Sequence, residues 1–220
     1  MNVPFNRHAG FAAPLPHQNL DTDQIIPARF LTGSRSDGFE QFLFHDLRHD
    51  SAGRAKAGFV LDEPSFRAAT VLVAGDNFGC GSSREQAVWS LQDTGYRAIV
   101  APSFGEIFAD NAATNGLLAI QLEADQVSRL LQSLADGPRE IAIDLPQQTL
   151  TAEALGCIRF PIDAFFKDCL VHGMTALDLT LTRLGLIEAF ERTHKSALPW
   201  AFARPDTKPM LDPVLVRHTP

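Results

Sequence analysis

The sequence has few of the residues that build redox and metal frameworks. Its three cysteines, Cys80, Cys157 and Cys169, are widely spaced, and no two of them form a Cys-x-x-Cys pair. We therefore expect three reduced thiols, with no disulfide framework, no zinc site and no set of iron–sulfur ligands in this chain. The sequence accordingly predicts no metal-binding residue.

Long apolar runs and an excess of positive charge are also absent. No apolar stretch approaches the roughly 20 residues that a membrane span needs. The first residues include Arg7, His8, Pro14 and Pro16 instead of the apolar core of a signal peptide. The formal net charge of −7 argues against a general nucleic-acid-binding or anionic-membrane-binding surface. We expect a cytoplasmic protein with no nucleic-acid or membrane partner.

The composition is that of an ordinary soluble globular domain, with 45% hydrophobic and 20% charged residues in a chain of 220. A chain of this length can form one sizeable core. Several prolines follow Ser196. We expect one domain over residues 1–195 and a proline-containing tail over residues 196–220.

The hydrophobic pattern predicts an α/β fold with a β-α-β-α-β core of parallel strands. The core strands are expected at 70–74, 97–101 and 117–122, and the helices between them at 83–94 and 104–114, the second closed by Gly116. Further helices are expected at 124–135, 163–172 and 184–194. Extra strands are expected around 141–145 and in a hairpin about Gly156. Residues 24–30 read as a short strand or turn, and residues 45–64 as an irregular excursion.

Residues 75–85 form a glycine-rich turn between the first core strand and its helix. Ser82-x-x-Glu85 matches the capping box that opens a helix, and Gly95 is expected to follow the end of that helix. A helix N-terminus presents backbone N–H groups and partial positive charge. Arg84 adds a full positive charge there, which indicates a nearby anion, and its planar fork suits a carboxylate. The alternative is a helix cap with a solvated arginine.

Two common glycine-rich motifs do not fit this turn. It lacks the Gly-Lys-Ser/Thr ending of a phosphate-binding loop. It also gives only the first two glycines of the dinucleotide-binding fingerprint, with Arg84 where the third belongs.

The residues Asn77-Phe78-Gly79-Cys80-Gly81-Ser82-Ser83-Arg84-Glu85 resemble the small subunits of 3-isopropylmalate dehydratase, which correspond to the swivelling domain of the aconitase superfamily. The resemblance extends in order from about Pro14 to about Phe190. It includes Asn19 to Leu31, Leu43 to Arg48, Ile99 to Phe108, Asn115 to Leu118 and Ile162 to Phe165.

The resemblance implies an aconitase-type swivelling β/β/α domain and a hydro-lyase that isomerises 2- and 3-isopropylmalate in leucine biosynthesis. Ser82 matches the serine base, and Arg84 matches the arginine that binds a substrate carboxylate. Ser83, Gly81 and Arg35 are expected to contribute to substrate binding. The resemblance places no cofactor in this chain, and it implies a large subunit that holds a [4Fe–4S] cluster.

Several departures from the family pattern leave alternatives open. Gln86 stands where the family has histidine, and Val88 where it has proline. The segment Ser36–Glu40, with Arg35 one residue early, could suit another hydroxy-diacid of the citramalate, 2,3-dimethylmalate or homoaconitate type. A carboxylate-binding module without catalysis is a further alternative. Asp21, Thr22 and Asp23 could shape the site or act only as turn and cap residues.

Overall fold

The computed structural model describes residues 2–202, which fall into two compact units. The first unit is Met1–Leu177 and contains the sheet, while the second, Asp178–Pro220, is helical where it is described. The boundary between the units lies before the expected domain end at residue 195. The tail over 196–220 stays a prediction, because most of it lies outside the described residues.

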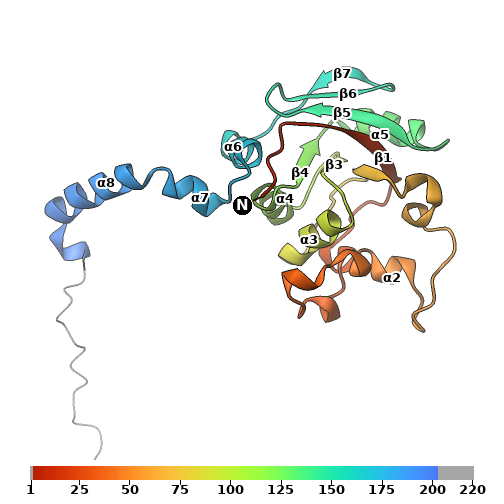
Figure 1. The fold of residues 1–220 in the computed structure, drawn as a ribbon, viewed down its shortest axis with the longest axis horizontal. Coiled ribbons are helices and arrows are strands. Elements are labelled where there is room, and N and C mark those ends of the chain that lie inside the picture. Colours follow the sequence, from red (N-terminus) through yellow and green to blue (C-terminus); the bar gives the residue numbers. More distant parts are fainter. Residues whose placement is uncertain (1, 203–220) are drawn as a thin grey trace, which may run out of the picture. The chain divides into compact units, whose positions relative to one another are not determined.

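Helices separate the first five strands of the first unit along the chain, and the last three strands follow one another directly (Figure 1). The strands are β1 Arg7–Leu15, β2 Ala69–Ala74, β3 Ala98–Ala101, β4 Leu118–Gln121, β5 Arg139–Asp144, β6 Thr149–Ala152 and β7 Gly156–Arg159. The helices are α1 Thr22–Ile25, α2 His45–Arg48, α3 Glu85–Asp93, α4 Glu106–Asn115, α5 Ala124–Ser133, α6 Ala164–His172, α7 Ala176–Leu181 and α8 Leu184–Ala197, the last belonging to the second unit.

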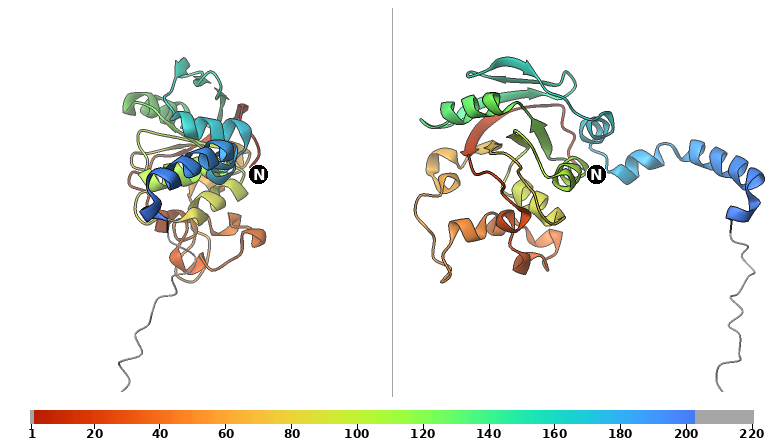
Figure 2. Two further views of the ribbon diagram at one scale, coloured as in Figure 1. Left: turned by 90° about the vertical axis from the view of Figure 1, so that its left-hand side faces the viewer. Right: turned by 180° about the vertical axis from the view of Figure 1, so that it is seen from behind.

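The strands form one mixed sheet in the order β4-β3-β2-β1-β5-β6-β7. The first four are parallel, and β5, β6 and β7 continue the sheet in antiparallel pairs. Figure 1 shows β5–β7 at the top of this unit and α2 and α3 at the bottom, and the rear view of Figure 2 shows the same arrangement. The predicted α/β class with a parallel core and extra strands is therefore confirmed.

Both faces of the parallel part of the sheet are covered, which explains its almost unbroken apolar strands. On β2, Val71 and Val73 pack into one core with residues of α5, whereas Leu72 and Ala74 pack into the other with residues of α3. The excursion between β1 and β2 also buries Phe39 and Phe44 in the core that contains α3. The sheet is thus the middle layer, and its carboxyl-terminal edge carries the turn that follows β2.

Two local predictions need correction. The capping box at Ser82 is wrong, because α3 begins at Glu85 and its N-cap residue is Arg84, with no side-chain capping bond. The box is formed instead at Asp21 and Gln24, where it opens α1. Residues 24–30 are therefore a helical turn and a short 3-10 turn, and the strand alternative is wrong. Gly95 and Gly116 follow their helices with positive φ, as expected.

Within residues 2–202, no helix has both the length and the apolar character needed to cross a bilayer.

Candidate active site

The glycine-rich turn after β2 is held on both sides by backbone pairing. On one side, the Gly79 amide donates to the Leu20 carbonyl at 2.7 Å, and the Thr22 amide donates to the Cys80 carbonyl at 2.9 Å. On the other side, the Phe78 amide donates to the Ser103 carbonyl at 3.1 Å. The turn is therefore sandwiched between residues 19–22, which follow β1, and residues 103–105, which follow β3.

Two glycines allow this close packing. A Cβ added at Gly79 would lie 2.7 Å from Cβ of Phe108, and the φ of Gly79 is +73°. A Cβ added at Gly105 would lie 2.9 Å from the carbonyl carbon of Gly79 and 3.0 Å from Cα of Cys80. Real Cβ atoms do not approach so closely, so both positions need glycine. The start of α4 is consequently pressed directly against the turn.

The tip of the turn faces outward. Gly81, Ser82 and Ser83 are exposed, and Gly81 has a φ of +90°, a conformation that favours glycine. The buried hydroxyl of Thr22 donates to the Ser82 carbonyl at 2.7 Å. This bond fixes the backbone at Ser82 while its side chain stays on the surface. The structure thus brings Gly81, Ser82 and Ser83 together at the entrance of α3.

Arg84 is held in place by the segment that contains Asp23. Its Nη1 and Nη2 atoms donate to Oδ1 and Oδ2 of Asp23, the second at 2.6 Å, and Nη1 also donates to the Ile26 carbonyl at 3.2 Å. The arginine side chain is only 11% exposed, whereas that of Asp23 is 57% exposed. The hydrogen bond from Arg84 lowers the pKa of Asp23. The anion that the position of Arg84 indicates is therefore supplied, in this structure, by the chain itself.

Helix α3 is hydrogen-bonded to Asn115, the last residue of α4. Asn115 donates to Glu85 at 2.8 Å and accepts from the indole N–H of Trp89 at 3.1 Å. The Asn115 carbonyl also accepts from Gln92 at 2.6 Å. These contacts fix the direction of α3, and so the direction in which its N-terminus, next to Ser83 and Arg84, points.

Arg35 lies away from these residues. Its guanidinium pairs with Asp93 at 2.8 Å and lies 5.3 Å above the ring of Trp89. Asp93 is the last residue of α3, so at a rise of roughly 1.5 Å per residue Arg35 is anchored about 12 Å along the helix from its start. The structure does not bring Arg35 together with Ser82, and its role in substrate binding stays a prediction.

The three cysteines are dispersed over the fold. Cys80 is partly buried in the turn, Cys157 is exposed on β7 and Cys169 is buried in α6. Burial, followed by the charge of Asp21, raises the pKa of Cys80. Over residues 2–202, no three side chains of the His, Cys, Asp and Glu types are grouped so that they could hold a metal. The described residues therefore do not fit a [4Fe–4S] site.

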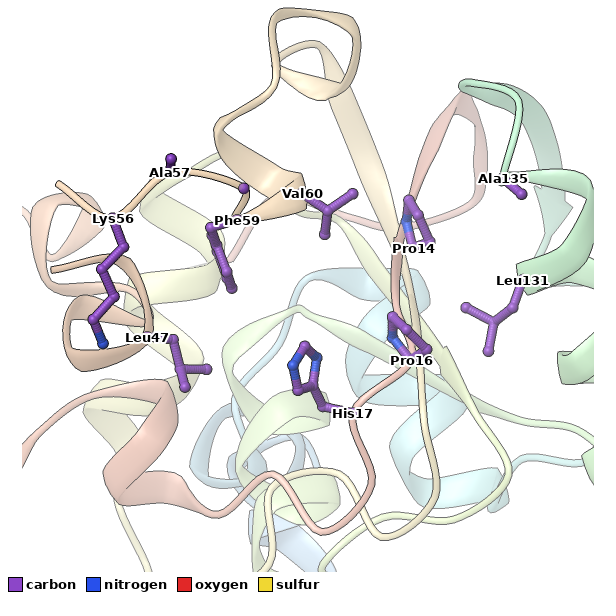
Figure 3. Close-up of a pocket in the computed structure, with 11 residues that line it drawn as sticks. Pro14, Pro16, His17, Leu47, Lys56, Ala57, Phe59, Val60, Leu131 and Ala135 are labelled. Carbon is purple, nitrogen blue, oxygen red and sulfur yellow. The ribbon is translucent and has the colours of Figure 1, made fainter.

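An apolar cavity of about 470 Å³ lies elsewhere in the same unit (Figure 3). Its lining comes from the end of β1, the excursion before β2 and α5, and not from the turn at 75–85. His17 and Lys56 are the only ionisable side chains in this lining. Figure 3 shows His17 between Leu47 and Pro16. Its described lining holds no serine hydroxyl, cysteine or carboxylate and no helix N-terminus with an arginine beside it, so the turn remains the better candidate for an active site.

Sequence reasoning gave no definite role to two residues that shape the site, Thr22 and Asp23. Both act on the turn from about 60 positions earlier in the chain, and no local pattern reveals such a pairing. The available signal was the acidic and hydroxyl cluster Asp21-Thr22-Asp23 itself. Asp21 is indeed a cap residue. Thr22 donates a hydrogen bond to the Ser82 carbonyl, and Asp23 forms an ion pair with Arg84.

The comparisons with known proteins agree with the fold. The family described as the aconitase C-terminal domain matches residues 2–125. The chain is 43% identical over 197 residues to the 3-isopropylmalate dehydratase small subunit of Dinoroseobacter shibae, covering 89% of this chain and 98% of that protein. It is 44% identical, with the same coverage, to the corresponding subunit of Paramagnetospirillum magneticum.

A solved structure supports the same assignment. The crystal structure of 3-isopropylmalate dehydratase from Methanocaldococcus jannaschii matches with a TM-score of 0.57 at 26% sequence identity. The match covers 84% of this chain and 99% of that chain. The chain belongs to the aconitase C-terminal domain family, among the small subunits of 3-isopropylmalate dehydratase.

Proposed function

We propose that this protein is the small subunit of a 3-isopropylmalate dehydratase, which interconverts 2- and 3-isopropylmalate through dehydration and rehydration. The observation that carries the proposal is the turn at residues 81–84. It presents exposed Ser82 and Ser83 directly before Arg84, whose guanidinium is held by Asp23, at the start of α3. The relatives that cover almost the whole chain carry the name of this enzyme's small subunit.

Ser82 is the base in this proposal. The proton to be removed lies on a carbon next to a carboxylate and is weakly acidic, so the enzyme needs a strong base. A serine hydroxyl can serve only where positive charge and N–H donors stabilise the alkoxide. Arg84, two residues after Ser82, and the N-terminus of α3, which begins at Glu85, are the candidates to supply them. The bond from Thr22 to the Ser82 carbonyl keeps that residue oriented.

Arg84 binds a carboxylate of the substrate, with Gly81 and Ser83 at its side. In the free chain the guanidinium is already oriented by Asp23 and by the Ile26 carbonyl. An arginine held in this way loses little further freedom when the substrate binds. The substrate carboxylate then takes up N–H groups of an arginine that stays ionised, since the hydrogen bond to Asp23 raises the pKa of Arg84.

A large subunit completes the site in this proposal. The [4Fe–4S] cluster that the resemblance implies would be held by that subunit, where it supplies a Lewis acid for the departing hydroxyl. The present chain contributes Ser82 and Arg84, and alone it is expected to be inactive. An exposed catalytic turn suits this division, because its side chains remain accessible until the partner covers them.

An anaerobic assay with the cognate large subunit and its reconstituted cluster tests the proposal. Alkene absorbance is followed with 3-isopropylmalate, citramalate, 2,3-dimethylmalate and homocitrate in parallel. We expect turnover of 3-isopropylmalate. Preference for another acid would assign the chain to a related dehydratase and make Ser36–Glu40 the candidate determinant of specificity. No turnover of any of them would favour a carboxylate-binding module.

Two substitutions test the assigned roles in the same assay. Ser82→Ala is expected to reduce kcat by about 100- to 10,000-fold, the range for loss of a general base. Arg84→Lys should fold normally but lose most activity, because a point charge cannot replace the planar fork. Near-normal kcat/KM in either variant would contradict the role of that residue.

A further inference from the structure

The apolar cavity shown in Figure 3 has the size of a small-molecule site. Its volume is about 470 Å³, within the roughly 300–1,000 Å³ that such sites occupy. Half-buried aliphatic and aromatic side chains form its walls: Leu47, Phe59, Val60 and Leu131. They come from the excursion before β2 and from α5, so segments far apart in the sequence build one apolar surface.

Lys56 lies in the lining of this cavity with a charge that no acidic side chain pairs. Its Nζ atom donates to the main-chain carbonyl of Asp46 at 2.7 Å, which uses one of the three N–H groups of an ammonium. The carboxylate of Asp46 is bound by Arg29, and that of Asp50 by Arg54. Among the described residues, none forms an ion pair with Lys56. Its remaining N–H groups are therefore available to an anion.

His17 supplies a second polar group to the same cavity. Figure 3 shows its ring between Leu47 and Pro16, and within residues 2–202 neither ring nitrogen has a hydrogen-bond partner. A neutral imidazole has one N–H donor, and a protonated imidazole has two. The ionisable groups of the described lining are thus a cation and a histidine, with no carboxylate beside them.

We propose that the apolar cavity binds an aliphatic monocarboxylate. The carboxylate is held by the ammonium of Lys56 and the ring of His17, and the hydrocarbon chain lies against the apolar walls. An uncharged hydrocarbon would leave both polar groups unused. A second charge on the ligand would have to be desolvated against apolar side chains, which is costly.

An apolar side chain of another protein fits the cavity less well than such a ligand. A protein that covered the cavity would bury the ammonium of Lys56 without an anion, and an unpaired buried charge is strongly unfavourable. A small carboxylate brings the neutralising charge with it. The charge of the lining therefore favours the small ligand.

Isothermal titration calorimetry of the full chain with octanoate tests the proposal. We expect 1-octanol, which lacks the charge, to bind about tenfold more weakly. Hexanoate lacks two methylene groups and should bind about fifteenfold more weakly, since each buried methylene is worth about fourfold in Kd. No binding of octanoate would overturn the site. Equal binding of octanoate and 1-octanol would overturn recognition of the carboxylate.

Lys56→Met tests the ammonium, because methionine keeps an apolar stem but no charge. We expect the Kd for octanoate to rise about tenfold, with the Kd for 1-octanol unchanged. Lys195→Met, the same change at an exposed position on α8, is the control and should bind octanoate normally. An unchanged Kd for octanoate in Lys56→Met, or equal weakening of both ligands, would overturn the role of Lys56.

Ala57→Glu tests the position of the site without removing any contact. Ala57 and Ala52 are both exposed in the excursion before β2, but only Ala57 lines the cavity. A carboxylate at residue 57 should weaken octanoate binding about fivefold, the effect of one like charge a few ångströms away in water. Ala52→Glu adds the same charge outside the lining and should have no effect. Equal Kd values in the two variants would place octanoate elsewhere and overturn the proposal.

A titration of the complex with the large subunit decides between the ligand and a protein as occupant. We expect the Kd for octanoate to be the same in the complex as in the free chain. Loss of binding in the complex would overturn the proposal in favour of a docking pocket for that subunit. These measurements do not use turnover, so they stand apart from the proposed function. A chain that binds octanoate but converts no isopropylmalate would contradict only the proposed function.

Discussion

Asp23 binds Arg84 through both of its carboxylate oxygens, although the two residues are 61 positions apart in the chain. The contact joins the segment after β1 to the turn after β2, two neighbouring strands of the parallel sheet. The arginine is largely buried and the aspartate is half-exposed. A paired, two-pronged contact of this kind fixes the plane of the guanidinium as well as its position.

Asp23→Asn should mainly weaken substrate binding. The amide cannot keep both hydrogen bonds with Arg84 as acceptor, so the guanidinium loses its orientation. We expect KM for 3-isopropylmalate to rise about tenfold, the equivalent of one charged hydrogen bond, with a smaller change in kcat. Steady-state kinetics with the large subunit measure both. Asp144→Asn, which alters the exposed ion pair with Arg7, is the control and should leave both parameters unchanged. An unchanged KM in Asp23→Asn would show that Arg84 does not need this partner.

Thr22→Val tests whether a buried hydroxyl positions the catalytic serine. Valine keeps the shape of the side chain but cannot donate to the Ser82 carbonyl. We expect kcat to fall about tenfold, while the free energy of unfolding drops by about 1–3 kcal/mol for the unpaired carbonyl. Thr94→Val removes a similar hydroxyl bond, to Ser90 at the far end of α3, and should not affect kcat. Equal kcat values in the two variants would mean that the Thr22 bond serves stability alone.

Gly79→Ala should strongly destabilise the fold. The new methyl group would overlap Phe108, and alanine would have to adopt a φ of +73°. Overpacking of this kind costs about 1–3 kcal/mol, in addition to the backbone strain. Gly58→Ala is the matched control, since Gly58 has a φ of +87° but no atom within 4 Å of the added methyl. Urea denaturation of both variants separates the two effects, and equal losses would show that Phe108 moves aside at no cost.

His8 should make the protein less stable at mildly acidic pH. Its Nε2 atom lies 2.7 Å from the Thr70 hydroxyl, and burial, followed by the charge of Arg97, lowers its pKa. The unfolded chain therefore takes up a proton near the ordinary pKa of 6.5, before the folded protein does. The free energy of unfolding should consequently fall as the pH drops below about 6.5.

Urea denaturation at pH 5.5 and 7.5 measures this effect. His8→Gln should reduce the difference in unfolding free energy between the two pH values, because glutamine does not titrate. If His8→Gln kept the full difference in unfolding free energy between the two pH values, groups other than His8 would cause the pH dependence.

The parallel core was predictable because its strands are short, apolar and buried on both faces. Val71, Leu72 and Val73 are all fully buried, so an unbroken run of aliphatic residues is enough to predict this strand. Gly116 likewise predicts the end of α4, because the left-handed backbone conformation at that position favours glycine. Such strands and helix ends depend on a few consecutive residues, so they can be predicted from the sequence.

The arrangement of the catalytic turn could not be predicted in the same way. Ser82 looked like a helix cap, but the carbonyl bond to Thr22 and the extended backbone of Arg84 (φ −137°, ψ 104°) delay the start of α3 to Glu85. The sequence indicated an anion near Arg84 but could not identify Asp23 as its partner. Contacts between residues some 60 positions apart decide both points, and local patterns do not encode them.

The manner in which the turn is anchored makes it an attractive target for protein engineering. Its frame depends on backbone amide and carbonyl groups of residues 19–22 and 103–105, on the Thr22 hydroxyl, and on the small size of Gly79 and Gly105. The side chains of Ser82 and Ser83 take no part in these anchoring contacts and are exposed. Libraries randomised at these two positions could therefore sample new chemistry on an unaltered scaffold, provided that the glycines are left untouched.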